Sequence, residues 1–184
     1  MKKNIVLMFA FALSACSSML TYVPPHYSVA ADNTLALKKL GAGNINVGPF
    51  TKIAEFDNNC GITAGVVGMP DNLSFAGYIQ KGLVDELRLA GMLDDATPKI
   101  TLTGIVEQLS FFSRRTVYTS TWNIGLRVNS SNGKSVHVSD RYDFDAGAFS
   151  AADCQKIADY YMPAVQKILG KLITAPEFQS LVTP

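Results

Sequence analysis

Residues that carry catalysis are scarce in this chain of 184 residues. It contains two histidines, three cysteines and one tryptophan. Neither a G-x-S-x-G nucleophile elbow nor an H-E-x-x-H zinc motif occurs. The segment Gly65-Val66-Val67-Gly68 lacks the spacing and the lysine of a phosphate-binding loop. These absences argue against the common serine hydrolases, zinc proteases and P-loop nucleotide hydrolases. We therefore expect no catalytic residues and a protein that is not an enzyme.

Three acidic residues lie close together in the sequence without forming a metal motif. Asp140, Asp143 and Asp145 fall in a segment that alternates like a strand, so Asp140 points away from the other two. The glycine turn of a calcium-binding loop is missing from this segment. His137 lies between two valines on the polar face of the same strand, where a solvated histidine is the common case. The sequence therefore predicts no metal site and no cofactor.

Neither an excess of one charge nor a second long apolar run is present. The chain has 16 basic and 15 acidic residues, for a net charge of +1. This balance argues against a nucleic-acid partner and against a polybasic patch for anionic lipid. Beyond the N-terminus, no run reaches the about 20 apolar residues that a helix needs to cross a bilayer. Any membrane attachment must therefore come from another feature.

That feature is the N-terminus. Two lysines at positions 2 and 3 precede a short apolar run over residues 5–12, and Leu13-Ser14-Ala15-Cys16 follows directly. The run is too short to span a membrane, and its flanks are those of a signal peptide. The whole pattern resembles a bacterial lipoprotein signal with its lipobox. One alternative remains, a plain secreted protein with an unrelated cysteine.

The lipoprotein resemblance implies where the protein is held. In such proteins a diacylglyceryl group alkylates the cysteine thiol, the signal is removed, and Cys16 becomes the acylated first residue. Each buried methylene of an acyl chain such as palmitate contributes about 0.8 kcal/mol, so two or three chains anchor the protein firmly. In enterobacterial lipoproteins an Asp after the cysteine favours the inner membrane. Ser17 therefore implies lipid anchoring in the outer membrane, facing the periplasm.

Three segments follow from this interpretation. Residues 1–15 are the signal peptide, residues 16–43 a lipid-anchored tether, and residues 44–184 a single periplasmic domain. Pro24-Pro25 prevents regular structure in the tether, and Asn33 is predicted to cap a short helix over residues 34–40. We expect the tether to behave as a flexible coil that spans about 30 Å.

The two remaining cysteines predict a disulfide. The periplasm is oxidising, and neither Cys60 nor Cys154 lies in the C-x-x-C motif of redox enzymes. A Cys60–Cys154 bond is the simplest account, and it would fix a long glycine- and asparagine-rich loop over residues 51–72. Free buried thiols or a reactive site are the alternatives.

The pattern of the domain predicts an α+β fold of order β-α-β-β-β-α. Strands are predicted over residues 44–50, 99–112, 116–129 and 135–145, and helices over residues 74–91 and 150–175. Ser74 and Gly91 are predicted to cap the first helix, whose apolar stripe leaves Glu86 and its charged neighbours on the other side. Pro163 is predicted to kink the second. A crossover makes the first two strands parallel.

The resulting sheet is four-stranded and mainly antiparallel, with both helices on one face. Asn132-Gly133 predicts a tight hairpin between the last two strands.

Two exposed surfaces are then candidates for binding a partner. The first is a hairpin tip in which aromatic residues lie beside arginines, as at interface hot spots: Phe111, Phe112, Arg114, Arg115 and Tyr118. The second is the polar open face of the sheet, with Thr101, Thr103, Asn123, Arg127, His137, Arg141 and Asp143. Packed rings with solvated arginines, and a merely wet sheet face, are the alternatives.

A lipobox, a short tether and a small β-α-β-β-β-α body resemble small periplasmic lipoproteins, among them auxiliary lipoproteins of ABC-type transport systems and outer-membrane assembly lipoproteins. The stretches from Phe75 to Gly91 and from Cys154 to Phe178 are similar to uncharacterised proteobacterial lipoproteins. The resemblance implies a non-enzymatic envelope protein with a protein partner. A lipid- or small-molecule-binding module and an enzyme with an unrecognised site are the alternatives.

Overall fold

The computed structural model describes residues 20–41, 43–52, 55–60, 65–114, 119–145 and 151–184, without the side chains of residues 113–114 and 151–153. Cys16 and the signal peptide lie outside these residues. The strands are β1 (Thr21–Tyr22), β2 (Ile45–Lys52), β3 (Val66–Val67), β4 (Ile100–Arg114), β5 (Thr119–Ser130) and β6 (Ser135–Asp145). The helices are α1 (Ala31–Leu40), α2 (Phe75–Ala90), α3 (Ala151–Asp159), α4 (Tyr161–Thr174) and α5 (Phe178–Val182), with a 3₁₀ turn at Pro70–Asn72.

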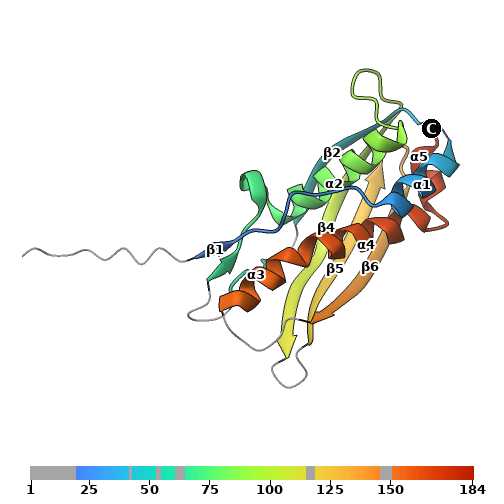
Figure 1. The fold of residues 1–184 in the computed structure, drawn as a ribbon. Coiled ribbons are helices and arrows are strands. Elements are labelled where there is room, and N and C mark those ends of the chain that lie inside the picture. The colour runs from blue at the N-terminus through green and yellow to red at the C-terminus, as the bar shows by residue number, and fades with distance from the viewer. Residues whose placement is uncertain (1–19, 42, 53–54, 61–64, 115–118, 146–150) are drawn as a thin grey trace, which may run out of the picture.

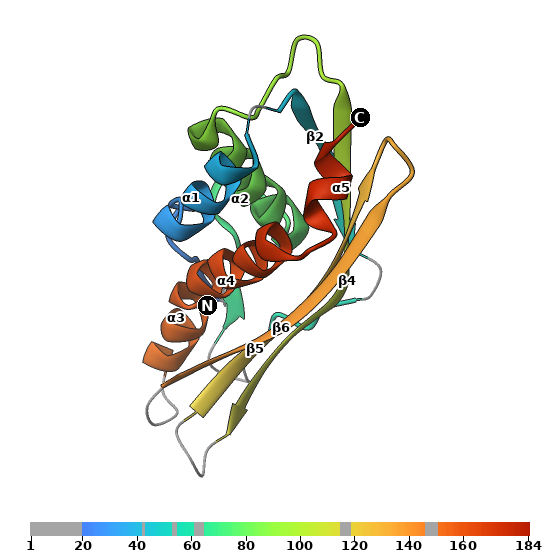
Figure 2. The same cartoon turned by 90° about the vertical axis from the view of Figure 1, so that its right-hand side faces the viewer.

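The main sheet confirms the predicted α+β fold. Its strand order is β2-β4-β5-β6, with β2 parallel to β4 and the other pairs antiparallel. Helices α2 and α4 lie along one face of this sheet, and no helix of the described residues covers the other face (Figures 1 and 2). A second, two-stranded sheet pairs β1 with β3 in parallel. The sequence pattern did not predict this small sheet, because each of its strands is only two residues long.

The ends of α2 follow from its predicted caps. The Ser74 hydroxyl accepts a hydrogen bond from the backbone N–H of Gly77 at 2.9 Å. Gly91 ends the helix in the left-handed region with φ of +76°, a conformation that costs a residue with a side chain more than it costs glycine. Helix α2 is therefore fixed in length and in its place on the sheet.

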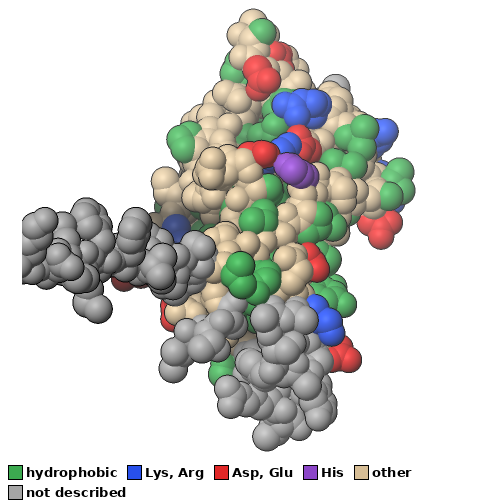
Figure 3. All heavy atoms as spheres, turned by 60° about the vertical axis from the view of Figure 1, so that its left-hand side comes forward, with side chains coloured by type: hydrophobic (Ala, Val, Ile, Leu, Met, Phe, Trp, Pro, Cys, Tyr) green, Lys and Arg blue, Asp and Glu red, His purple; other side chains and the backbone are tan. Residues whose placement is uncertain are grey.

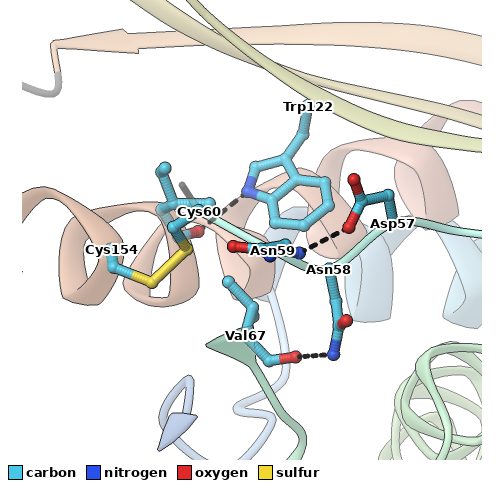
Figure 4. The surroundings of a disulfide bond; sticks show 8 residues. Asp57, Asn58, Asn59, Cys60, Val67, Trp122 and Cys154 are labelled. Atoms are coloured by element: carbon cyan, nitrogen blue, oxygen red, sulfur yellow. Dashed lines mark hydrogen bonds between the residues drawn. A yellow bond between two sulfur atoms is a disulfide. The ribbon is translucent and has the colours of Figure 1, made fainter. Parts of the chain in front are cut away.

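The core between the sheet and the helices is filled by aromatic and branched side chains. Trp122 of β5 is fully buried, and its indole N–H donates to the carbonyl of Ile157 in α3 at 2.9 Å. The ring of Tyr161 packs on Trp122 with their centroids 4.8 Å apart. The predicted disulfide is confirmed, since Cys60 and Cys154 are joined beside this cluster (Figure 4). It links the long loop after β2 to the helical layer.

The predicted last helix is divided near Pro163, as its sequence indicates. Helix α3 ends at Asp159 and α4 begins at Tyr161. Pro163 has no N–H to donate to the carbonyl of Asp159, and its ring crowds that carbonyl, so the helix bends at this point. The predicted start of this helix at Ser150 lies outside the described residues.

The N-terminal segment differs from the expectation of a free tether over residues 16–43. Residues 20–40, which we call the N-terminal strap, run along the body, and α1 packs on α2 and α4 (Figures 1 and 2). Tyr27 and Leu37 of the strap are buried in the core. Asn33 does not cap a helix as predicted, because α1 already begins at Ala31 and the Asn33 amide donates to the carbonyl of Gln166 at 3.0 Å.

Glu86 explains why the strap is docked. The sequence placed this residue on the polar side of α2, but the side chain is fully buried beneath the strap. Its carboxylate accepts hydrogen bonds from the Tyr27 hydroxyl at 2.8 Å, the Ala30 backbone N–H at 2.7 Å and the Thr34 hydroxyl at 2.8 Å. The Asn33 amide donates a longer one, at 3.4 Å. Burial, and then the charge of Glu86, raise the pKa of Tyr27, so this phenol stays a donor.

We predict that Glu86→Ala lowers the free energy of unfolding by about 3 kcal/mol, because it strands several buried donors. Asp85→Ala is the matched control, since the neighbouring carboxylate forms only surface ion pairs with Lys81 and Arg88 and should cost less than about 1 kcal/mol. Urea unfolding measures both losses. Hydrogen exchange should show the Ala30 amide unprotected in the Glu86 variant alone. Equal losses in the two variants would contradict this account.

Candidate functional site

The residues predicted at the hairpin tip do not form a single surface patch. Phe111 points into the core, where its ring lies 5.2 Å from that of Trp122. Phe112 points to the opposite face of the sheet and is 55 % exposed. Arg115 and Tyr118, together with the side chain of Arg114, lie outside the described residues. Of the predicted tip, only Phe112 is thus shown as an exposed aromatic side chain.

The open face of the sheet is built by the register of its three long strands. Cross-strand pairs place Arg127 opposite His137 and Asn123 opposite Arg141. Thr121 lies opposite both Phe112 and Asp143, so Phe112 is part of this same face. The alternation predicted from the sequence therefore brings together the polar residues that it assigned to the open face, and adds Phe112 to one end of them.

Charged groups on the open face are paired across strands. Glu107 of β4 contacts the Arg127 guanidinium at 2.6 Å and the His137 ring at 3.2 Å. Glu107 lies on this face by regular two-residue alternation from Thr103 and Ile105. The β4–β5 register shifts between Val106 and Gln108, and this bulge places Phe112 rather than Phe111 on the same face. Glu107 was not among the residues predicted for this face, although the two-residue period from Thr101 and Thr103 reaches it. The face thus presents both charge signs in a fixed arrangement.

A second pairing lies nearer to Phe112. The carboxylate of Asp143 accepts hydrogen bonds from the Thr121 hydroxyl at 2.5 Å and from the Arg141 guanidinium at 2.7 Å. These two hydrogen bonds lower the pKa of Asp143, with the bond from Thr121 contributing most. Asp143 therefore remains a carboxylate that is bonded to Thr121 on the neighbouring strand and to Arg141 on its own strand.

Both edges of the main sheet are partly closed. On β6, Lys171 donates to the carbonyl of Ser139 at 2.7 Å and Lys167 to that of Arg141 at 3.0 Å. On β2, the backbone of Ile45 is bonded to that of Met92 and Asp94. Proline has no N–H, so Pro49 removes one donor from the same strand. Addition of a partner strand is disfavoured at both edges.

The described surface carries hollows beside the helical layer and on the open face of the sheet. A groove of about 580 Å³ runs between α1 and the end of α4, with Leu35, Lys39, Ile173 and Gln179 among its lining residues. A smaller hollow of about 230 Å³ lies on the open face beside Gln108 and Asn123.

Within the described ranges, no three His, Cys, Asp or Glu side chains are grouped so that they could hold a metal ion. The helices in that part of the chain include none of the length and hydrophobicity needed to span a bilayer.

Comparison with known proteins shows a similarity of fold. The sequence matches no family model and no curated protein. Among solved structures, a DUF330 protein from Xanthomonas campestris has a TM-score of 0.52 at 10% identity, over 84% of this chain and 95% of that chain. An uncharacterized protein has a TM-score of 0.45 at 9% identity, over 83% and 99% of the two chains. A "putative lipoprotein" from Caulobacter crescentus has a TM-score of 0.41 at 13% identity, over 82% and 94%. The chain is thus similar in fold to a DUF330 protein over most of both chains.

Proposed function

We propose that this protein is a lipid-anchored, non-enzymatic interaction protein of the bacterial cell envelope. In this proposal Cys16 carries the lipid, Ser17 directs the protein to the outer membrane, and the folded body faces the periplasm. The lipobox at Leu13–Cys16 supports the anchor. The fold supports a role as an interaction protein, because its helices and strap cover one face of the sheet and leave the other face available to a protein partner.

The exposed aromatic ring on the open face is the observation that carries the partner. Phe112 is 55 % exposed at one end of a face that otherwise presents paired polar groups. Interfaces of this kind place an aromatic anchor within a polar rim, and a few such anchors supply most of the binding free energy. The Glu107–Arg127–His137 group supplies charges of both signs for complementarity. We therefore assign the envelope protein partner to the open face.

The alternative of a lipid-binding module gains no support from the interior. Trp122, Tyr78 and Tyr161 are fully buried between the sheet and the helices, and their rings contact one another or their neighbours. A lipid chain in this position would have to displace these rings. The described packing therefore favours the binding of a partner at the surface over the binding of a lipid in the interior.

We predict that Cys16→Ser abolishes membrane attachment. Without a thiol no diacylglyceryl group can be added, and a protein without its acyl chains loses the about 0.8 kcal/mol per buried methylene that holds it at the bilayer. Metabolic labelling with an alkyne fatty acid and fractionation of the envelope measure the result. Ser17→Asp is the companion variant, which should remain lipidated and move to the inner membrane. Recovery of fatty-acid-labelled Cys16→Ser protein in the membrane fraction would contradict a lipid anchor on Cys16.

We predict that Phe112→Ser weakens partner capture about thirtyfold, because loss of an interface aromatic costs on the order of 2 kcal/mol. Leu89→Ser is the matched control, since Leu89 of α2 is 54 % exposed on a different surface. Crosslinking in intact cells, followed by quantitative mass spectrometry of the captured partner, compares the two variants. Thermal unfolding should show both variants folded. Equal capture by both variants would remove the open face as the partner site.

A further inference from the structure

The first described residues of the chain are held by backbone hydrogen bonds. The Val66 N–H donates to the carbonyl of Leu20 at 2.9 Å, and the Gly68 N–H to that of Tyr22 at 2.8 Å. These bonds join β1 to β3 in parallel. The amide of Gln155 in α3 adds a hydrogen bond to the Val23 carbonyl at 3.2 Å. Residues 20–23 are therefore held at a fixed place beside β3 and α3.

The strand that holds β1 is itself stapled to the helical layer. The Val67 N–H donates to the Asn58 carbonyl at 2.8 Å, and the Asn58 amide returns a bond to the Val67 carbonyl at 2.8 Å. Two residues further along, Cys60 is joined to Cys154 of α3 (Figure 4). A continuous set of bonds thus runs from β1 through β3 and the disulfide to α3. At its other end, the strap is held by Glu86.

The remaining length of chain limits how far the body can lie from a lipid on Cys16. Cys16 precedes Leu20 by only four residues, which span at most about 14 Å when fully extended. A coil over residues 16–43 would instead span about 30 Å and would let any side of the body face the bilayer. The docked strap removes that freedom.

From this geometry we infer that the side of the body formed by β1, β3 and α3 rests against the surface of the lipid bilayer. We call it the membrane-facing side. The opposite side, with the C-terminus, α5 and the β5–β6 turn, then points into the periplasm (Figure 1). The inference rests on the lipid anchor at Cys16 proposed above, and adds a fixed orientation to it.

The exposed side chains next to the anchor fit this contact. Leu20 is 62 % exposed and Val23 is 37 % exposed, and both lie in the segment that follows the lipidated residue. On the face seen in Figure 3, hydrophobic, acidic and basic side chains are interspersed. The lipid and these two apolar residues therefore supply the attraction to the bilayer, and the short chain supplies the orientation.

Energy transfer to labelled lipid tests the orientation. Full-length lipidated protein is purified from its host and placed in vesicles of phosphatidylethanolamine and phosphatidylglycerol, with a headgroup-labelled acceptor. One donor dye is attached through Lys156→Cys, an exposed position of α3 on the membrane-facing side, and in a second sample through Lys134→Cys, an exposed position near the C-terminus. The Lys156 site should transfer severalfold more efficiently than the Lys134 site.

A linker variant serves as the control. Insertion of roughly 20 Gly and Ser residues between Ser18 and Met19 leaves the strap intact but restores a long coil, so the difference between the two sites should be lost. Equal transfer from both sites without the insertion, or stronger transfer from the Lys134 site, would overturn the orientation. Protein that fails to float with the vesicles at all would instead refute the anchor on Cys16.

Discussion

The buried carboxylate of Glu86 is the constraint on which the arrangement of the N-terminal half depends. A charge in the interior is costly unless its oxygens are bonded, and all its hydrogen-bond donors here come from residues 27–34. The strap cannot lift from α2 without leaving that charge unpaired. This group therefore holds residues 27–34 of the strap against the folded body. The place of residues 20–23 is set separately, by the hydrogen bonds of β1 with β3 and of Gln155 with Val23.

The strap is fixed at two ends by different kinds of bonding. Glu86 holds the region of Tyr27 through side-chain hydrogen bonds, and β3 holds β1 through backbone hydrogen bonds. Between them, the Tyr78 hydroxyl donates to the carbonyl of Pro25 at 2.8 Å. Pro24-Pro25 correctly indicated a segment without regular structure, but an irregular segment need not be a mobile one. Side chains of the body donate hydrogen bonds to its carbonyls, Tyr78 to Pro25 and Gln155 to Val23.

Much of the fold was readable from local patterns, and the strap was not. Caps at Ser74 and Gly91, the Asn132-Gly133 turn and strict alternation in β5 and β6 each act within a few residues, so the sequence reveals them directly. Glu86 depends on donors more than fifty residues away. A signal was nevertheless present, because Glu86 follows Leu83 by three residues and so lies at the border of the apolar stripe of α2. The residues predicted for the open face lie there, and Glu107, which was not predicted, joins them by the same two-residue period. The bulge beside Glu107 adds Phe112 to this face.

The way in which each surface is covered indicates how a partner can bind. One face of the sheet is covered by α2 and α4, and these helices are covered in turn by α1. The β6 edge has two of its carbonyls bonded by lysines of α4, and the β2 edge is interrupted by Pro49. Strand addition is therefore a poor route to a complex. In the proposed complex, side chains of the open face would make the contact, and the exposed ring of Phe112 would contribute more than backbone groups. If the proposed lipid on Cys16 and the docked strap together fix the orientation of the body, the open face is held at a defined angle to the bilayer.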